Sequence, residues 1–229
     1  MSPAKREEFF RRLAQAIPDP KSELNFGTPY ELLVAVVLSA QATDKSVNLA
    51  TAKLFPVANT PAKIAALGVE GLEKYVKTIG LYRGKAKNVV ALSKILLEKH
   101  GAEVPRTREA LEELPGVGRK TANVVLNAAF GEPTVAVDTH VFRVANRTGL
   151  APGKDPLEVE LKLLKVVPEK YLQHAHHYLI LHGRYTCLAK KPLCGKCPVY
   201  GQCEFREKKK FAALTPQGAT GERAGAGGR

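Results

Sequence analysis

Apolar residues recur three and four positions apart along most of the chain, which is the spacing of one face of an α-helix. In segment 28–39, Leu33, Val34, Val37 and Leu38 share such a face. Short polar or Gly/Pro-containing joints separate this segment from others with the same pattern. The further helices that the pattern predicts are 46–55, 61–66, 71–78, 85–99, 108–114, 119–130, 139–147, 156–166 and 171–182.

Extended segments have little support in the sequence. Only 134–137 has the composition of a strand, and it is too short and isolated to found a sheet. No unit repeats at a fixed period. The sequence therefore predicts an all-α fold, and 229 residues with 45% hydrophobic content suffice for one large domain or two small ones.

The two ends of the chain differ from its middle. The first twelve residues are charged and lack the apolar run of a secretion leader, and no stretch reaches the roughly 18 apolar residues of a membrane span. We therefore expect a cytoplasmic protein. Segment 208–229 is rich in Lys, then in Gly, Ala and Arg, and has too few large apolar side chains to pack, so we predict that it is disordered.

The charge balance indicates a partner. Lys and Arg number 35 against 22 acidic residues, which gives a net charge of +13. Such an excess is typical of proteins that bind the phosphate backbone of nucleic acids, although a merely basic surface is the alternative.

All four cysteines fall in one short segment, as Cys187, Cys194, Cys197 and Cys203. Clustered thiols with no partner elsewhere fit a metal site in a reducing compartment better than disulfides. Zinc sites usually show two C-x2-C pairs, and only Cys194 and Cys197 form one here. The longer arms favour a [4Fe-4S] cluster held by four thiolates, with zinc as the alternative.

A glycine-containing turn, 114–120, lies between two predicted helices. Gly116 and Gly118 permit a tight turn and close backbone approach, and the N–H groups that open the next helix can bind an anion such as a DNA phosphate. An ordinary helix-to-helix turn is the alternative. On the helix that follows, Lys120, Asn123 and Asn127 share a polar face, which we expect to be exposed.

Lys120 lies in the first turn of that helix, where the positive end of the helix dipole disfavours an ammonium ion. A lysine in such a place is a candidate nucleophile that forms an imine, although most exposed lysines are only solvated charges. Asp138 directly precedes another predicted helix and suits an N-cap, with a role beside Lys120 as the second interpretation. His140 is a candidate phosphate contact or a structural histidine.

Together these motifs resemble the endonuclease III family of bifunctional DNA glycosylases with AP lyase activity. Segments 38–44 (LSAQATD) and 78–82 (TIGLY) extend the resemblance, which spans about 28–205. It implies a helix-hairpin-helix fold of two helical domains with a [4Fe-4S] cluster. We accordingly expect a six-helix barrel at 22–132 and a cluster domain made of 1–21 with 133–207.

The resemblance also implies roles for single residues. Lys120 would be the nucleophile and Asp138 its catalytic carboxylate, acting on oxidised pyrimidines and abasic sites in duplex DNA. Gln41 would fill the space that the flipped nucleotide leaves, and Leu81 would wedge between bases of the opposite strand. The other expected DNA contacts are Gly116, Gly118, His140, Lys190 and Lys191, and we expect a monomer.

Two rival interpretations remain. An adenine glycosylase acting on mismatches shares the hairpin and the cluster but lacks a lysine nucleophile, so Lys120 and the short chain disfavour it. A non-catalytic iron-sulfur DNA-binding protein would leave Lys120 as a surface charge and Asp138 as a cap.

Overall fold

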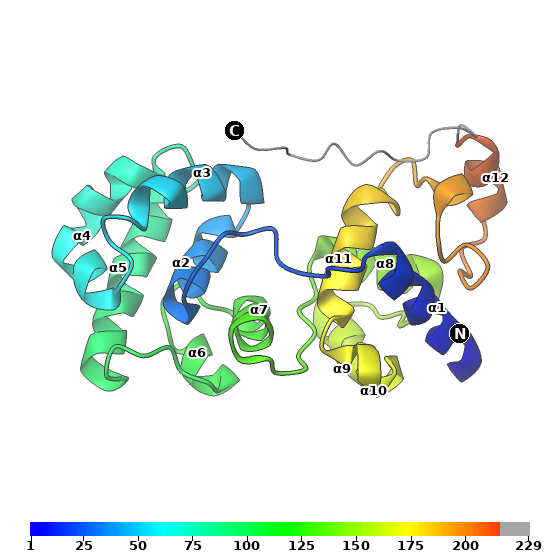
Figure 1. Ribbon diagram of the computed structural model, residues 1–229, viewed down its shortest axis with the longest axis horizontal. Coiled ribbons are helices and arrows are strands. Elements are labelled where there is room, and N and C mark those ends of the chain that lie inside the picture. The colour runs from blue at the N-terminus through cyan, green and yellow to red at the C-terminus, as the bar shows by residue number, and fades with distance from the viewer. Residues whose placement is uncertain (216–229) are drawn as a thin grey trace. The chain divides into compact units, whose positions relative to one another are not determined.

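The computed structural model describes residues 1–215, and within them every regular element is a helix, as the sequence predicts. Figure 1 labels these helices along the chain. In chain order the helices are α1 Pro3–Ala16, α2 Pro29–Ser39, α3 Asp44–Leu54, α4 Pro61–Val76, α5 Tyr82–Lys99, α6 Arg108–Glu112, α7 Arg119–Phe130, α8 Thr139–Thr148, α9 Pro156–Val166, α10 Glu169–Leu172, α11 Ala175–Tyr185, the 3-10 helix η1 Cys194–Lys196, and α12 Lys208–Ala213.

The chain divides into two compact units. The first, the hairpin unit, comprises Asp19–Asp138 and Glu169–His177. The second, the cysteine unit, comprises Met1–Pro18, Thr139–Pro168 and the segment from Tyr178 onward. The expected partition gave residues 133–138 to the cluster domain, whereas here they pack in the hairpin unit because Thr134 and Ala136 hydrogen-bond to α7 and to His176.

Helix α2 is the centre of the hairpin unit. Every residue from Tyr30 to Leu38 is buried, so the helix is covered on all sides, as a core helix must be. Its start follows from the sequence, since Thr28 accepts a hydrogen bond from the N–H of Glu31 and Pro29 occupies the first turn. Helices α3, α5 and α7 pack around it, and α4 lies alongside α5 (Figure 1).

Helix α4 contains a break at Gly68, whose φ of 68° and ψ of 177° are not helical. The sequence predicts two separate helices, 61–66 and 71–78, with Gly68 between them. Glycine adopts this backbone conformation without steric cost, which explains why the two halves meet there.

The cysteine unit begins and ends the described chain. Helix α1 buries Phe9, Phe10 and Leu13. Helix α12 occupies Lys208–Ala213, where the sequence predicts disorder, and this part of the prediction is wrong. The Lys208 ammonium donates to the carbonyls of Tyr200 and Cys203, and the Phe211 ring stacks on Phe205, so these residues have partners that composition does not reveal. The rest of the expected disordered tail, 216–229, lies outside the described residues.

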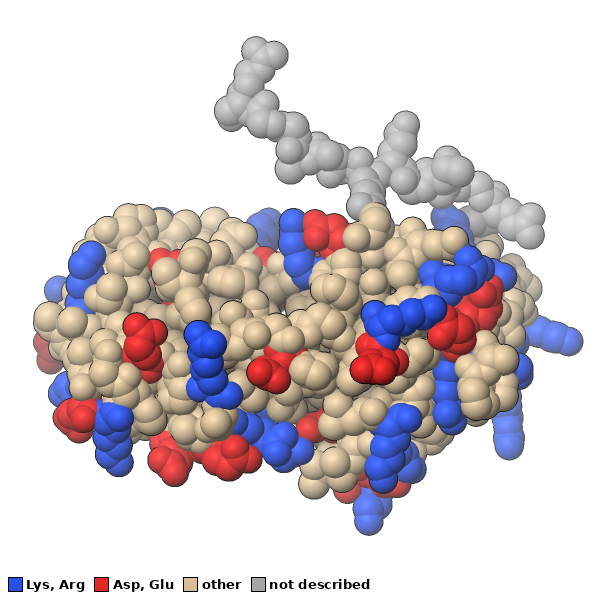
Figure 2. All heavy atoms as spheres, turned by 60° about the horizontal axis from the view of Figure 1, so that its bottom comes forward, with Lys and Arg blue, Asp and Glu red and all other residues tan. Residues whose placement is uncertain are grey.

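No helix within residues 1–215 combines the length and the apolarity that crossing a membrane requires. Basic and acidic side chains are interspersed on the face that Figure 2 presents. On that face, the basic residues that give the chain its net charge of +13 do not form one continuous patch.

Candidate functional site

The glycine turn connects α6 to α7 in the hairpin unit. Gly116 has a φ of 81°, and a Cβ atom there would lie 2.9 Å from Asn88 Nδ2 and 3.2 Å from Val37 Cγ1. Only glycine fits both the conformation and the space. Gly118 is the N-cap of α7 and no side chain caps the first N–H groups of that helix, so they remain available to an anion.

Lys120 is exposed in the first turn of α7, as expected. The rest of its helix face is not exposed, and here the expectation is wrong, because Asn123 is 1% and Asn127 4% accessible. The amide of Asn127 donates to the carbonyls of Glu132, Thr134 and Gln173. Periodicity identified the polar face but could not show that the chain after α7 folds back over it.

The segment that leads to Asp138 runs along α7. The Thr134 hydroxyl donates to the Asn123 carbonyl at 2.6 Å, and the Ala136 carbonyl lies 2.8 Å from His176 Nδ1. Val135, Ala136 and Val137 are buried, and Asp138 is half-buried at the end of the segment. The contact with Asn123 fixes the segment beside the N-terminal half of α7, the half that carries Lys120.

His140 belongs to the cysteine unit, in the first turn of α8. It is half-buried, and its Cβ packs against α11 at Gly183, where a Cβ atom would lie only 2.9 Å away. Asp138 has an interaction partner in the structure, and its role as an N-cap stays a prediction.

Gln41 and Leu81 share an unusual backbone conformation. Their φ values are 53° and 60°, in the left-handed region that costs a residue with a side chain about 1 to 2 kcal/mol. Their loops are neighbours, since a Cβ atom at Gly80 would lie 3.8 Å from the Gln41 carbonyl oxygen. Leu81 is 65% exposed, and Gln41 is exposed as well. Strain held at two exposed, adjacent loop tips is typical of functional positions.

A cavity of about 480 Å³ lies in the hairpin unit beside the C-terminal half of α7. Phe26, Asn127, Gln173 and His177 are among the residues that line it. His177 is 6% exposed, and its Nδ1 atom is buried without a hydrogen-bond partner in the described chain. Burial lowers the pKa of this imidazole to about 3, so the ring is neutral near pH 7. Sequence reasoning gave no signal for this cavity, because its walls come from three distant segments.

The four cysteines gather in the cysteine unit, and all are free thiols. Burial, and then the charges of Cys187 and Cys203, raise the pKa of Cys194; for Cys197 burial raises the pKa to about 12. The four thiols are close enough to influence each other's ionisation, although within residues 1–215 no three of them converge on one point as a closed metal site. Thiolate sulfur is a ligand that suits iron or zinc.

Two arginines of α8, which the sequence analysis missed, hold the loop that follows Cys187. Arg147 contacts the Cys187 sulfur at 3.5 Å and donates to the carbonyls of Leu188 and Ala189 at 2.6 and 2.8 Å. Arg143 donates to the Gly183 and Cys187 carbonyls. The i, i+4 spacing of these arginines was the available signal. Lys190 and Lys191, which follow in the same loop, are exposed.

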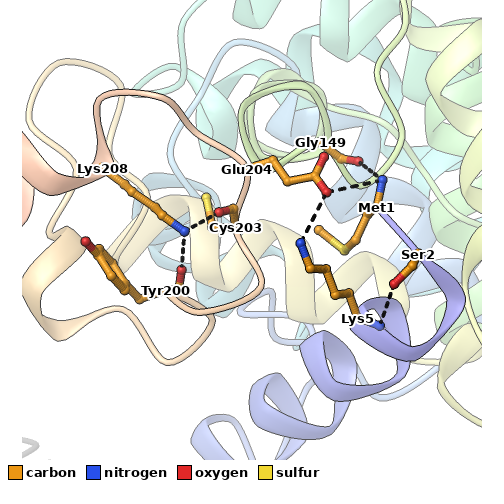
Figure 3. A network of polar contacts seen from close by, with 8 residues as sticks. All are labelled: Met1, Ser2, Lys5, Gly149, Tyr200, Cys203, Glu204 and Lys208. Atoms are coloured by element: carbon orange, nitrogen blue, oxygen red, sulfur yellow. Dashed lines mark hydrogen bonds and ion pairs between the residues drawn. The ribbon is translucent and has the colours of Figure 1, made fainter.

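The end of the cysteine segment is fastened by a second polar network (Figure 3). Glu204, next to Cys203, lies 3.4 Å from the Met1 amino group and 3.8 Å from Lys5 Nζ. Lys208 binds the Tyr200 and Cys203 carbonyls from the other side. Charged groups therefore fix the backbone near both ends of the cysteine segment. Arg147 does so near Cys187, and Lys208 does so at Cys203.

Known proteins resemble the chain over most of its length. Residues 34–169 match the family model of the HhH-GPD superfamily base excision DNA repair proteins, and residues 187–203 match the iron-sulfur binding domain of endonuclease III. Endonuclease III of Escherichia coli (strain K12) is 64% identical over 208 residues, which are 91% of this chain and 99% of that protein. The Haemophilus influenzae (strain ATCC 51907 / DSM 11121 / KW20 / Rd) endonuclease III is 60% identical over 211 residues, covering 92% of this chain and 100% of that protein.

Solved structures agree with this relationship. A trapped endonuclease III–DNA covalent intermediate superimposes with a TM-score of 0.85 at 46% identity, over 92% of this chain and 98% of that one. A thermostable thymine-DNA glycosylase superimposes with a TM-score of 0.80 at 25% identity, over 90% and 98%. The match at 187–203 favours iron and sulfide over zinc, and the cofactor is a [4Fe-4S] cluster. The chain belongs to the HhH-GPD superfamily of base excision DNA repair proteins, and within it to the endonuclease III family.

Proposed function

We propose that this protein removes oxidised pyrimidines from duplex DNA and then cleaves the strand at the abasic site. The observation that carries the proposal is the exposed amine of Lys120, which directly follows the glycine turn. A related structure is described as a covalent intermediate between endonuclease III and DNA. A covalent intermediate requires a nucleophile, and a lysine amine can supply one by forming an imine.

In the proposed reaction, the neutral amine of Lys120 attacks C1′ of the damaged nucleotide. The bond from C1′ to the base breaks, and the base leaves with the electron pair and takes up a proton. Loss of the amine proton and opening of the sugar ring give an imine between Lys120 and C1′. The imine acidifies the hydrogens on C2′; removal of one as a proton breaks the C3′–O bond, and the phosphate leaves with that electron pair. Water then hydrolyses the imine and restores Lys120.

Asp138 assists these steps as the catalytic carboxylate. Its segment is fixed beside α7 by the Thr134 and Ala136 hydrogen bonds, so the carboxylate has a defined position. An ionised carboxylate stabilises the positive charge that develops on the sugar and can carry the C2′ proton. His140, two residues further on, is proposed to contact a DNA phosphate.

The DNA distortion is assigned to the two strained loops. Leu81 is apolar and 65% exposed, which suits a wedge that unstacks a base step. Gln41 can replace the hydrogen bonds of the nucleotide that leaves the duplex. Because the two loops are adjacent, both side chains can enter one duplex at the same place. Gly116, Gly118 and the first N–H groups of α7 would bind a backbone phosphate.

The cavity beside α7 is the proposed pocket for the extruded base. Asn127 follows Lys120 by seven residues, which is two helical turns, so the cavity lies on the Lys120 face of α7 and about 10 Å along the helix. A volume of about 480 Å³ accommodates a pyrimidine ring. Phe26 offers a stacking surface, while Gln173 and neutral His177 offer hydrogen bonds to the polar edge of the base.

Cys187, Cys194, Cys197 and Cys203 would hold the cofactor, because four free thiols in the matched segment 187–203 supply the sulfur ligands that it requires. When bound, it supplies a cross-link among the four thiolates that stiffens the surrounding loops. The loop between Cys187 and Cys194 then presents Lys190 and Lys191 to the DNA backbone. The two units take the expected domain roles: the hairpin unit carries the glycine turn, and the cysteine unit carries the cluster. We propose that the protein acts as a monomer.

Covalent trapping tests the proposal. The protein is incubated with borohydride and a duplex that carries thymine glycol or an abasic site, because borohydride reduces an imine to a stable amine. We expect a covalent protein–DNA band for the wild type and for Lys99→Ala, an exposed lysine at the end of α5, and no band for Lys120→Ala. Tight DNA binding without any band would instead support an adenine-type glycosylase or a non-catalytic iron-sulfur protein.

A further inference from the structure

Lys85 carries a charged group that the hairpin unit buries without a partner. The residue is 6% exposed, and its Nζ atom has no hydrogen-bond partner in the described chain. Burial lowers the pKa of this amine below its ordinary range. A buried polar group without a partner destabilises the fold, so its presence calls for a role outside the free protein.

Lys85 lies in the first turn of α5, an 18-residue helix. Leu81 is the N-cap residue of the helix, no side chain caps its first N–H groups, and its first turn contains no acidic residue. The Lys85 N–H reaches back to the Leu81 carbonyl at 3.2 Å and closes the first turn. The N–H groups before it have no acceptor within the helix and point out of its positive end.

General helix geometry gives the direction expected for the Lys85 side chain. Side chains on a helix tilt toward its N-terminus, so we expect the four-carbon stem of Lys85 to run back along the first turn. Approach to the turn from solvent is open at Gly84, where a Cβ atom would meet nothing within 4 Å. Backbone donors, a helix dipole and a shielded cation thus act on one point.

The position of this turn indicates the anion. It directly follows Leu81, the proposed wedge, and the Gln41 loop lies beside Gly80. The anions nearest to a wedge inside a duplex are the phosphates that flank the opened base step. Phosphate is also among the anions that uncapped helix N-termini bind.

We propose that the first turn of α5, with Lys85 beneath it, binds a backbone phosphate of the DNA strand that Leu81 enters. This inference rests on the proposed function, because it requires DNA as the substrate. Lys85 need not touch the phosphate, since a charge shielded from water acts over a few ångströms. The site positions Leu81 against the strand and carries no sequence information.

Lys85→Met tests the site, because methionine keeps an unbranched apolar stem and removes the charge. We expect two effects of opposite sign in the cluster-containing protein. The melting temperature of the free protein stays equal or rises, because an unpaired buried charge is gone. The affinity for a duplex with a tetrahydrofuran abasic analogue falls about tenfold. The slope of log K against log salt concentration falls by about 0.9, the value for one phosphate contact.

Lys87→Met is the matched control, since Lys87 is exposed two residues further along the same helix. Its loss of charge should change the affinity and the salt slope by less than half as much. Three results would overturn the site: wild-type affinity and slope in Lys85→Met, equal effects in Lys87→Met, or a clear fall in the melting temperature of Lys85→Met, which would make Lys85 a structural residue. Failure of the wild type to bind the duplex would count against the proposed function instead.

Discussion

The guanidinium of Arg147 lies 3.5 Å from the sulfur of Cys187. The same group donates to the Leu188 and Ala189 carbonyls, so one side chain of α8 fixes both the first cysteine and the start of the loop that follows it. A positive charge beside a thiolate also stabilises its ionised, metal-binding form.

Replacing Arg147 should therefore weaken the hold on the cluster. We expect Arg147→Met to lose the visible absorbance of the cluster several times faster than the wild type under a chelator, and to lower the free energy of unfolding by about 1 to 2 kcal/mol because one half-buried and one exposed carbonyl lose a charged donor. Arg147→Lys should lie between the two, since it keeps the charge but not the forked donor. Lys191→Met, an exposed change of charge in the same loop, should retain the cluster like the wild type; rapid loss there too would point to net charge as the cause.

The backbone strain at Leu81 and its proposed role as a wedge can be measured separately. Leu81 has a φ of 60°, so Leu81→Gly should raise the free energy of unfolding by about 1 kcal/mol. The same change removes the apolar side chain, so glycosylase activity on a lesion in fully paired duplex should fall about tenfold or more. Thermal denaturation and single-turnover base release measure the two effects.

Ala102→Gly is the matched control for Leu81→Gly, because Ala102 also has a positive φ, 67°, and follows the other end of α5. It should gain stability without a change in base release. Equal activity in Leu81→Gly and the wild type would remove the wedge assignment.

Much of the fold could be predicted from local pattern. Thr28 and Pro29 mark the start of α2, and the run of apolar residues that follows predicts a buried helix. The glycine turn and the cysteine spacing were equally readable, because each depends on residue types at fixed intervals in one segment.

The parts that could not be predicted depend on contacts between distant segments. Asn123 and Asn127 occur on a polar helix face, yet the chain from 131 to 138 and Gln173 cover it. Composition alone assigns Lys208 to a disordered basic tail, but its ammonium group donates to the carbonyls of Tyr200 and Cys203. The left-handed conformation of Gln41 is likewise invisible in sequence, since glutamine seldom adopts it.

His177 should make the stability of the protein depend on acid pH. Its folded pKa is about 3, because burial and then the charges of His176 and His174 disfavour the imidazolium, whereas an unfolded histidine titrates near 6.5. The unfolded chain therefore binds the extra proton first, and the stabilisation, complete above pH 6.5, is lost as the pH falls toward 3.

From pH 6.5 to 5 this effect amounts to about 2 kcal/mol for one histidine. His177→Gln removes the titrating group. Between pH 6.5 and 5 the free energy of unfolding of the wild type should therefore fall by about 2 kcal/mol more than that of the variant. At pH 8, where the histidine is neutral in both states, the difference between the two free energies should be constant. A parallel pH dependence of the two proteins would show that His177 is protonated in the folded state.

The cavity beside α7 makes a prediction that separates the two proposed activities. An abasic site has no base, so a pocket for the base affects the glycosylase step and leaves the lyase step unchanged. Phe26 lines the cavity and is 38% exposed, so its removal should not disturb the core. We expect Phe26→Ala to lower kcat/KM for thymine glycol release about tenfold, the effect of one lost stacking contact, while cleavage of abasic duplex stays at the wild-type rate. An equal loss of both activities would mean that Phe26 acts through the fold or through DNA binding, and unchanged release of thymine glycol would show that the base goes elsewhere.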